Sequence, residues 1–211
     1  YMTDQGWPSD RTIYIPNFVD ERRGLPLERS TFDTPAGAPV ILALGRLHEN
    51  KGFDVLLEAL SVLPDVFLWL AGEGPQKQLL TRMANNLKVS DRVRFLGWRL
   101  DTPNLLATAD ALICPSRHEP LGNVILEAWA QERPVIAAAS DGPKELIQNG
   151  KNGFLCEINN ASNLADTIQK ILSDSSLASK IARNGATTYK SNFSKNIVVG
   201  KYQDFFEKVV Q

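Results

Sequence analysis

Short continuous apolar runs alternate with amphipathic segments from residue 40 onward. The runs are too uniformly hydrophobic to leave one face in water, which indicates strands buried on both faces of a sheet. The segments between them place apolar residues three or four positions apart, the spacing of a helix with one buried face. Strands are predicted at 40–44, 66–72, 92–97, 111–116, 134–139 and 153–158. Helices are predicted at 53–63, 76–87, 101–108, 122–131, 142–148, 161–173, 175–190 and 195–210.

This alternation predicts an α/β fold, a Rossmann-like parallel sheet with right-handed crossovers and with helices on both faces. Ligands of such folds bind outside the carboxyl ends of the strands. We therefore expect the chemistry in the loops that follow Leu44, Leu70, Leu96 and Cys114.

The first 36 residues follow a different pattern, because glycines and prolines interrupt every periodic run. One apolar stretch, residues 12–15, could form an edge strand that ends at Pro16. We interpret residues 1–36 as an inter-domain linker, residues 37–190 as the Rossmann-like domain and residues 191–211 as a separate C-terminal helix.

Composition narrows the class of protein further. The chain has 211 residues, of which 43% are hydrophobic, enough for one large folded domain. Its net charge of −1 does not indicate binding to nucleic acid or to a membrane surface. No apolar run approaches the length of a membrane span. Cys114 and Cys156 lie in apolar runs, so we expect buried thiols of a cytosolic protein and no disulfide.

The loop after the first predicted strand contains Gly45, Arg46, Lys51 and Gly52 and leads into a helix. The start of a helix offers N–H groups and a positive dipole end, to which Arg46 and Lys51 would add full charges. Arginine can bind two phosphate oxygens with its fork of N–H groups, and lysine supplies a point charge. The loop fits a phosphate site, but two solvated surface cations explain it equally well, because strand–glycine–helix junctions are common.

The loop after the strand at 111–116 supplies carboxylates. Glu119 lies in this loop, and Glu127 lies about two turns further along the helix that follows. Carboxylates accept hydrogen bonds from hydroxyl groups, so both side chains suit a sugar or a ribose. Gly122, at the start of the helix, permits close approach of the backbone to a ligand.

These blocks together resemble the retaining glycosyltransferases of family 4, also called group 1. The resemblance runs from about residue 15 to residue 185, and it depends on the ordered spacing of several blocks. The matching blocks are Gly45-Arg46, Lys51-Gly52, Gly72-Glu73-Gly74, Val93-Arg94-Phe95-Leu96-Gly97, Glu119-Pro120-Leu121-Gly122-Asn123 with Glu127, and Asn152-Gly153-Phe154-Leu155.

For the side chains, the resemblance implies three roles. The arginine and lysine that match Arg46 and Lys51 hold the donor diphosphate in the family, beside the glycine that matches Gly45. The glutamate that matches Glu119 contacts hydroxyl groups of the transferred sugar, so Arg46, Lys51 and Glu119 are the expected catalytic residues. The glutamate that matches Glu127 binds the ribose hydroxyl groups.

For the backbone, the resemblance implies contacts in two places. N–H groups around Leu121, Gly122 and Asn123 meet the phosphates in the family, and main chain near Gly97 and Trp98 meets the nucleobase. The Trp98 ring is a possible stacking partner for the base, although a tryptophan in a loop is more often a packing residue.

The resemblance also implies an arrangement of the whole molecule. The family has the two-domain GT-B fold, with the active site between two Rossmann-like halves. This chain resembles the second half, followed by a helix that crosses back to the first. We therefore expect it to be part of a longer protein whose N-terminal domain binds the acceptor, and to be inactive alone.

The expected reaction transfers a sugar from a UDP- or GDP-linked donor to an acceptor hydroxyl with retention of configuration. Relatives commonly act in cell-surface polysaccharide or lipopolysaccharide synthesis. We expect the same here, in the cytoplasm or, through the absent domain, at the inner face of the membrane. No metal or other cofactor is expected, because the sequence has no Asp-x-Asp pair and its two histidines and two cysteines offer no zinc cluster.

One departure from the family lies in a loop that often reads Gly-Gly and is Gly142-Pro143 here. Pro143 has no N–H group, so a contact that this group would make to the sugar is in doubt. Two other functions stay open. A nucleotide-sugar epimerase-type enzyme would need an acid–base set that we do not find, and a non-catalytic nucleotide-binding module of the receiver type would carry acidic residues where Arg46 and Lys51 stand.

Overall fold

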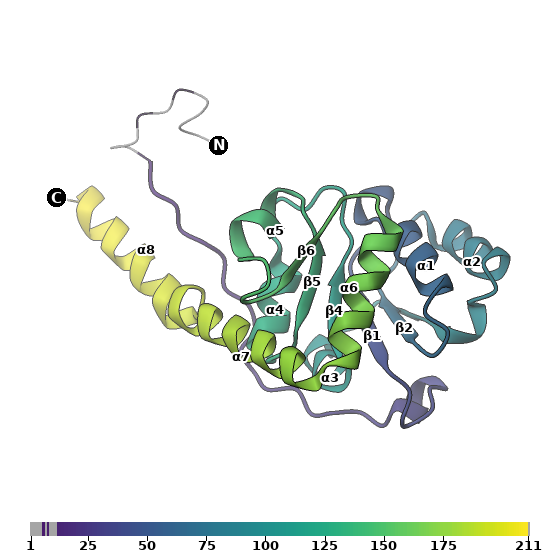
Figure 1. Ribbon diagram of the computed structural model, residues 1–211. Coiled ribbons are helices and arrows are strands. Elements are labelled where there is room, and N and C mark those ends of the chain that lie inside the picture. Colours follow the sequence, from purple (N-terminus) through teal and green to yellow (C-terminus); the bar gives the residue numbers. More distant parts are fainter. Residues whose placement is uncertain (1–5, 7, 9–11, 211) are drawn as a thin grey trace.

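The computed structural model describes residues 6, 8 and 12–210. One parallel sheet of six strands, in the order β3-β2-β1-β4-β5-β6, forms its centre (Figure 1). The predicted α/β class is confirmed, and all but the first strand are shorter than predicted, because their terminal residues turn into loops. The strands are β1 (Val40–Leu44), β2 (Phe67–Ala71), β3 (Val93–Gly97), β4 (Ala111–Cys114), β5 (Val135–Ala138) and β6 (Phe154–Cys156).

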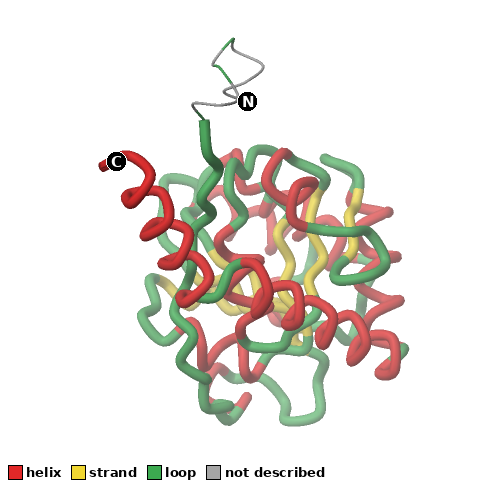
Figure 2. The backbone as a smooth tube through the Cα atoms, turned by 90° about the vertical axis from the view of Figure 1, so that its left-hand side faces the viewer, coloured by secondary structure: helices red, strands yellow, loops and turns green. Residues whose placement is uncertain are grey.

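Helices cover both faces of this sheet, and Figure 2 shows the strands gathered between them. The α-helices are α1 (Phe53–Ser61), α2 (Lys77–Asn86), α3 (Thr102–Thr108), α4 (Asn123–Ala130), α5 (Asp141–Leu146), α6 (Ala161–Ser173), α7 (Ser175–Asn192) and α8 (Lys195–Val210). Three short 3-10 turns are η2 (Arg29–Phe32), η3 (Glu49–Lys51) and η4 (Ser90–Arg92).

Two apolar cores lie on opposite faces of the sheet. In β1, Ile41 and Ala43 pack with α1, α2 and α6, whereas Val40, Leu42 and Leu44 pack with α3 and α4. Successive residues of a strand point to opposite faces. A strand between two helical layers must therefore be apolar at every position, which explains the uninterrupted hydrophobic runs in the sequence.

Two tryptophans anchor the α4 side of the sheet. Trp69 and Trp129 are fully buried. The indole N–H groups donate to Thr34 Oγ1 and to the Asn152 carbonyl oxygen, both at 3.0 Å. Gly185 of α7 lies directly on Trp129, since a Cβ atom at this position would come within 2.3 Å of the ring.

The N-terminal segment lies on the surface, and much of it is in contact with the domain (Figure 1). The predicted edge strand at 12–15 is wrong, because these residues have no β partner and run along α8, away from either edge of the sheet. Further on, the N–H group of Leu27 donates to Thr108 Oγ1 at 2.8 Å, and Arg29 pairs with Asp110 at 2.8 Å. The later part of the predicted linker is thus packed against the domain.

The break before the last helix lies slightly later than predicted, because α7 continues to Asn192. Glu21 of the N-terminal segment ties this junction together. Its Oε1 accepts hydrogen bonds from the Lys195 N–H group at 2.7 Å and from the Tyr189 hydroxyl at 3.3 Å. Beyond the junction α8 extends away from the sheet (Figure 1). None of the helices in the described part of the chain is long and apolar enough to cross a membrane.

Candidate functional site

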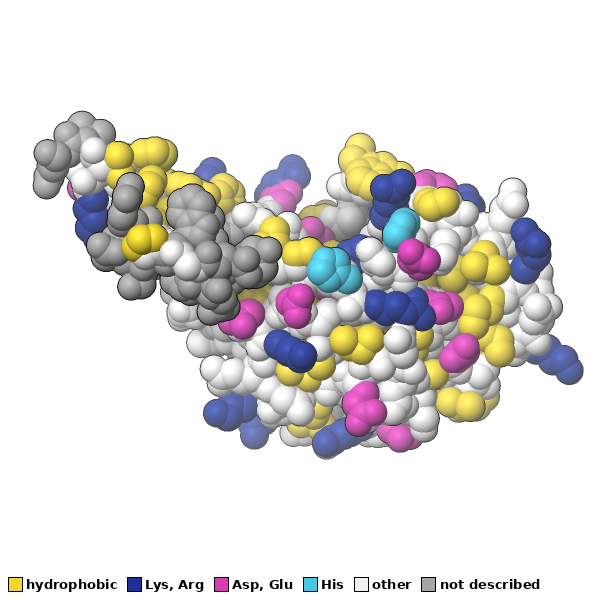
Figure 3. Space-filling view, turned by 90° about the horizontal axis from the view of Figure 1, so that it is seen from above, with side chains coloured by type: hydrophobic (Ala, Val, Ile, Leu, Met, Phe, Trp, Pro, Cys, Tyr) yellow, Lys and Arg dark blue, Asp and Glu magenta, His cyan; other side chains and the backbone are white. Residues whose placement is uncertain are grey.

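The strand order creates a crevice between β1 and β4. From β1 the chain moves outward through β2 and β3, and it then returns to build β4, β5 and β6 on the other side. The loops after β1 and β4 therefore leave the sheet in opposite directions, which is where ligands of open α/β sheets bind. Figure 3 looks onto this edge, where both histidines lie among acidic and basic side chains.

Close backbone contacts bring the two loops together. Gly52 has a φ of +64°, and a Cβ atom there would lie 2.1 Å from the Pro115 carbonyl oxygen. The N–H group of His118 donates to the Asn50 carbonyl oxygen at 3.2 Å. Across the crevice, a Cβ atom on Gly142 would lie 2.6 Å from the Glu119 carbonyl oxygen. Glycine at positions 52 and 142 thus permits the loops after β1, β4 and β5 to meet.

Lys51 and Glu119 form an ion pair in this crevice, with Lys51 Nζ 2.5 Å from Glu119 Oε2. The Ser116 hydroxyl donates to the same oxygen at 3.4 Å, and the Gly122 N–H group donates to Oε1 at 3.4 Å. Three donors thus fix a carboxylate that is almost fully buried. The structure therefore brings two of the three expected catalytic residues into direct contact.

Arg46 lies in the same loop but points to solvent. No hydrogen bond or ion pair of its side chain is found among the described residues. Three backbone N–H groups that precede the helix are already used within the fold. Gly45 donates to Ala71, Lys51 to His48 and Gly52 to Glu49. These three groups are therefore not free for phosphate, and the helix-start N–H groups begin at Phe53, the first residue of α1. Gly45 lies beside Lys51, whose Cε would be in ordinary van der Waals contact with an added Cβ at 3.4 Å.

Helix α4 supplies the other predicted donor-binding groups. Gly122 caps this helix with a φ of +72°. Its own N–H group points to Glu119, so the N–H groups that open the helix are those of Asn123 and Val124. The Asn123 side chain contacts Asn17 of the N-terminal segment at 3.2 Å, and Leu121 is exposed.

Glu127 is half-buried on α4 and has no hydrogen-bond partner among the described residues. Burial raises the pKa of its carboxyl group. A carboxylate that is partly removed from water without a partner is costly for the fold. The absence of a protein partner fits a group whose partner is a ligand.

The predicted nucleobase contacts lie at the end of β3, apart from the ion pair. Gly97 has a φ of +66°, and its carbonyl oxygen accepts a hydrogen bond from the Gly72 N–H group at 2.7 Å. Trp98 is 74% exposed, so it is not a packing residue. Because β2 separates β3 from β1, these residues lie about 10 Å across the sheet from the Lys51 loop.

An ion pair that the sequence did not predict fixes the loop after β4. Arg117 forms two hydrogen bonds with Asp54 of α1, at 2.8 and 2.6 Å, and a third with the Glu49 carbonyl oxygen at 2.6 Å. Burial is the largest single influence and would raise the pKa of Asp54, but the hydrogen bonds and charge of Arg117, together with backbone hydrogen bonds, lower it overall. In the sequence, only the position of Arg117 two residues before Glu119 indicates a role for it. That position does not identify Asp54, 63 residues away, as its partner.

The contact of Ser116 with Glu119 was also missed, and Ser116 lies beside the Cys114 thiol. Cys114 Sγ lies 3.5 Å from Ser116 Oγ, and burial raises the pKa of the Cys114 thiol. Cys114 and Cys156 are both buried and free, as predicted. In the described part of the chain, no three His, Cys, Asp or Glu side chains are grouped so that they could hold a metal ion.

Comparison with known proteins identifies the family. The model of the family described as glycosyl transferases group 1 matches residues 27–188. A lipopolysaccharide core biosynthesis glycosyltransferase of Rhizobium meliloti, LpsE, is 42% identical over 95% of this chain and 59% of its own length. A second such enzyme of that organism, LpsD, is 33% identical over 99% of this chain and 61% of its own length. The chain thus spans about three fifths of these relatives.

Solved structures agree in fold. The Anabaena protein HepE, in a complex with UDP and glucose, matches 99% of this chain and 59% of its own with a TM-score of 0.89 and 29% identity. The C-terminal domain of a group 1 glycosyltransferase from Francisella tularensis, LpcC, matches 84% of this chain and 99% of its own with a TM-score of 0.74 and 26% identity. By sequence and by fold, the chain belongs to the group 1 glycosyltransferases.

Proposed function

We propose that this chain is the donor-binding domain of a retaining glycosyltransferase, which binds a nucleotide-diphosphate sugar in the crevice between β1 and β4. The observation that carries the proposal is the Lys51–Glu119 ion pair at the topological switch point. A cation for phosphate and a carboxylate for hydroxyl groups stand side by side there, where a sugar diphosphate needs both.

Each group has a definite part in this proposal. Lys51 and Arg46 neutralise the diphosphate, Glu119 accepts hydrogen bonds from the transferred sugar, and Glu127 accepts them from the ribose. The N–H groups of Asn123 and Val124 lie at the positive end of α4 and add donors for the phosphates. The nucleobase lies toward Gly97 and Trp98, where the exposed indole ring offers a surface for stacking.

These groups act most strongly as the bond to the sugar breaks. Negative charge then builds on the departing diphosphate, so cations and N–H donors already in place stabilise the transition state more than the bound donor. Lys51 begins this process paired with Glu119. A bound diphosphate would compete for the ammonium group and leave the Glu119 carboxylate for the sugar. This chemistry requires no metal ion.

The acceptor is assigned to a domain outside this chain. The chain spans about three fifths of its two Rhizobium meliloti relatives, which leaves room in a longer protein for such a domain. We also propose a role in lipopolysaccharide or other cell-surface polysaccharide assembly, on the basis of the two Rhizobium meliloti relatives.

Calorimetric titration with UDP, GDP and ADP tests the donor site. We expect at least one nucleotide to bind, and Lys51→Ala and Arg46→Ala each to weaken it about tenfold or more, the size of one lost charge-assisted hydrogen bond. Lys180→Ala removes a surface lysine of α7 and serves as the control. If none of the three nucleotides bound, or if both site variants bound like the control, the assignment would be wrong.

A further inference from the structure

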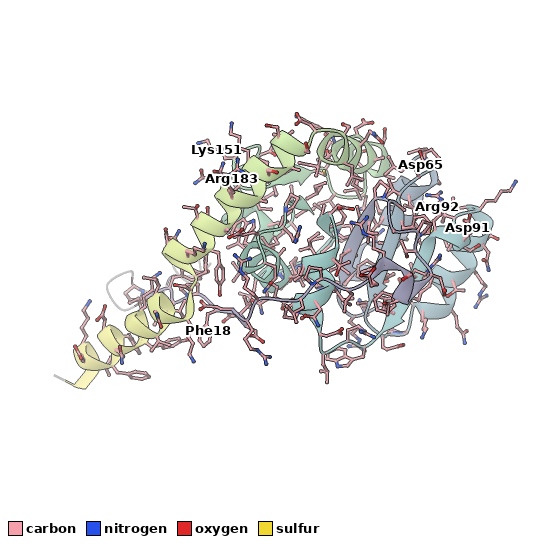
Figure 4. All side chains as sticks on the ribbon, turned by 90° about the horizontal axis from the view of Figure 1, so that it is seen from below. Phe18, Asp65, Asp91, Arg92, Lys151 and Arg183 are labelled. Atoms are coloured by element: carbon pink, nitrogen blue, oxygen red, sulfur yellow. The ribbon has the colours of Figure 1, made fainter. Side chains whose placement is uncertain are left out.

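A cavity of about 570 Å³ lies at the amino ends of the strands, opposite to the donor crevice at their carboxyl ends. Pro39, Asp110 and Pro134 line it, and each precedes a strand, respectively β1, β4 and β5. The Lys51–Glu119 pair instead follows the carboxyl ends of β1 and β4. Since a five-residue strand rises about 3.3 Å per residue, the two sites are about 16 Å apart. Figure 4 shows the molecule from the side of this cavity.

Arginines from three separate parts of the chain line the cavity: Arg29 of η2, Arg133 before β5 and Arg183 of α7. Arg183 is labelled on α7 in Figure 4. Two carboxylates, Asp110 and Glu132, also lie in the lining. The sum of these five charges is positive.

Both carboxylates already have basic partners. Arg29 binds both oxygens of Asp110, at 2.8 and 3.0 Å. Glu132 binds Arg23 at 2.6 Å, and the Lys190 ammonium lies 3.5 Å from the same oxygen. Of the charged groups in the lining, Arg29, Asp110 and Glu132 thus each have a partner of opposite charge.

Arg133 and Arg183 have no acidic partner among the described residues. The hydrogen bond found for the Arg133 guanidinium is to the Ala107 carbonyl oxygen at 2.8 Å, and its Nε is buried without a partner. Burial lowers the pKa of Arg133, and the charges of Asp110 and Glu132, which are paired with other cations, only partly oppose this shift. An anion in the cavity would supply the direct ionic partner that both arginines lack among the described residues.

We propose that this cavity is a second ligand site, which binds the phosphate group of a small soluble molecule between Arg133 and Arg183. Two guanidinium groups match the charge of a phosphate monoester, close to −2 at neutral pH, and each offers a fork of N–H donors. Ser179 of α7 adds a hydroxyl group to the lining. An apolar floor for the rest of the molecule is formed by Ile171, Leu172, Ala178 and Ala182.

Backbone amide NMR with inorganic phosphate and then glycerol phosphate, at constant ionic strength, tests this site in the chain as it stands. We expect saturable shifts at Arg133, Ser179 and Arg183 that both probes share. Arg183→Gln changes an exposed side chain that has no partner in the described part of the chain, so the domain should fold, and we expect the affinity at this site to fall about tenfold. Lys180→Gln, on the same helix but outside the lining, should leave it unchanged.

A second set of variants separates this site from the donor crevice. Lys51→Ala should leave the phosphate shifts around α7 unchanged, whether or not the crevice binds a nucleotide, and Arg133→Lys should weaken them while keeping the positive charge. The proposal is overturned if the α7 shifts are absent, if Arg183→Gln leaves them unchanged, or if Lys51→Ala removes them. Binding to phosphatidylglycerol vesicles without binding of either soluble probe would also contradict it.

Discussion

At the scale of single residues, the carboxylate of Glu119 is the most constrained group of the crevice. It is almost fully buried and accepts from Lys51, Ser116 and Gly122. A buried carboxylate held by several donors gives a fixed direction to its remaining acceptor positions. This geometry predicts a role in selecting the donor sugar more than in holding the nucleotide.

The variant Glu119→Gln tests that role. It removes the counter-charge of Lys51, so the ammonium group becomes free for a diphosphate. We expect UDP to bind as well as or better than before, whereas the extra affinity of UDP-glucose over UDP should fall about tenfold. Calorimetric titration with both ligands measures the difference, and an equal loss for UDP and UDP-glucose would contradict the sugar contact.

Glu127 makes a prediction about pH. Its pKa is raised by burial, so the folded state favours the protonated carboxyl group. The protonated Glu127 carboxyl group therefore contributes to the free energy of unfolding. This contribution is complete only below the pKa that the group has in the unfolded chain, and it is lost as the pH rises through its pKa in the folded state. Glu127→Gln should therefore be more stable than the wild type near pH 7, with an advantage that shrinks toward about pH 4. Urea denaturation at the two pH values measures it.

The same substitution should weaken nucleotide binding, since it removes the charge that the ribose hydroxyl groups would meet. A variant that gains stability and loses affinity would identify Glu127 as a group kept for binding. Equal stability of the two proteins at pH 7 would show that the buried carboxylate costs the fold nothing.

At the scale of elements, the approach of the loops after β1 and β4 depends on Gly52. Gly52→Ala introduces both a left-handed backbone for a non-glycine residue and a Cβ 2.1 Å from the Pro115 carbonyl oxygen. Gly150 has a similar φ of +74° with nothing within 4 Å, so Gly150→Ala is the matched control. The control should cost about 1 kcal/mol and Gly52→Ala about 2 kcal/mol more. Urea denaturation checks this difference, and equal costs would mean that the loops are not held in contact.

Helix α7 depends in the same way on Gly185. An added Cβ would meet Trp129 at 2.3 Å, so Gly185→Ala should push α7 away from α4 and destabilise the domain by about 2 kcal/mol. Gly200 of α8 has nothing within 4 Å. Gly200→Ala should be neutral or stabilise by about 0.5 kcal/mol, because alanine loses less backbone entropy in a helix. Thermal unfolding of both variants is the measurement, and a stable Gly185→Ala would contradict the packing.

At the scale of the whole molecule, most of the fold follows from the sequence and much of the site does not. Strands buried on both faces must be apolar at every position, as β1 shows. The ends of the strands were less predictable. Ser116, for example, directly follows an apolar run, but it belongs to the loop that contains Glu119 and not to β4. Residues 12–15 have strand composition but no strand beside them, which only the packing of the whole chain decides.

The site was predictable as a set of residues and not as a geometry. Lys51 and Glu119 are 68 positions apart, and their contact requires that Gly52 lie against Pro115, which the pattern of residues does not contain. The role of Arg117 is invisible for the same reason, because its partner Asp54 lies on α1. Ser116 is only three residues from Glu119, but the contact depends on how the loop folds. Trp98 is exposed, although a tryptophan in a loop is more often a packing residue.

The central claim is that a nucleotide diphosphate binds where Lys51 meets Glu119. A crystal structure of this chain grown with UDP tests it most directly. The account predicts the diphosphate between Lys51 Nζ and the first N–H groups of α4, with the Lys51–Glu119 pair lengthened or broken. A diphosphate bound elsewhere would contradict this claim. So would a structure in which the crevice holds no nucleotide and the Lys51–Glu119 pair is intact.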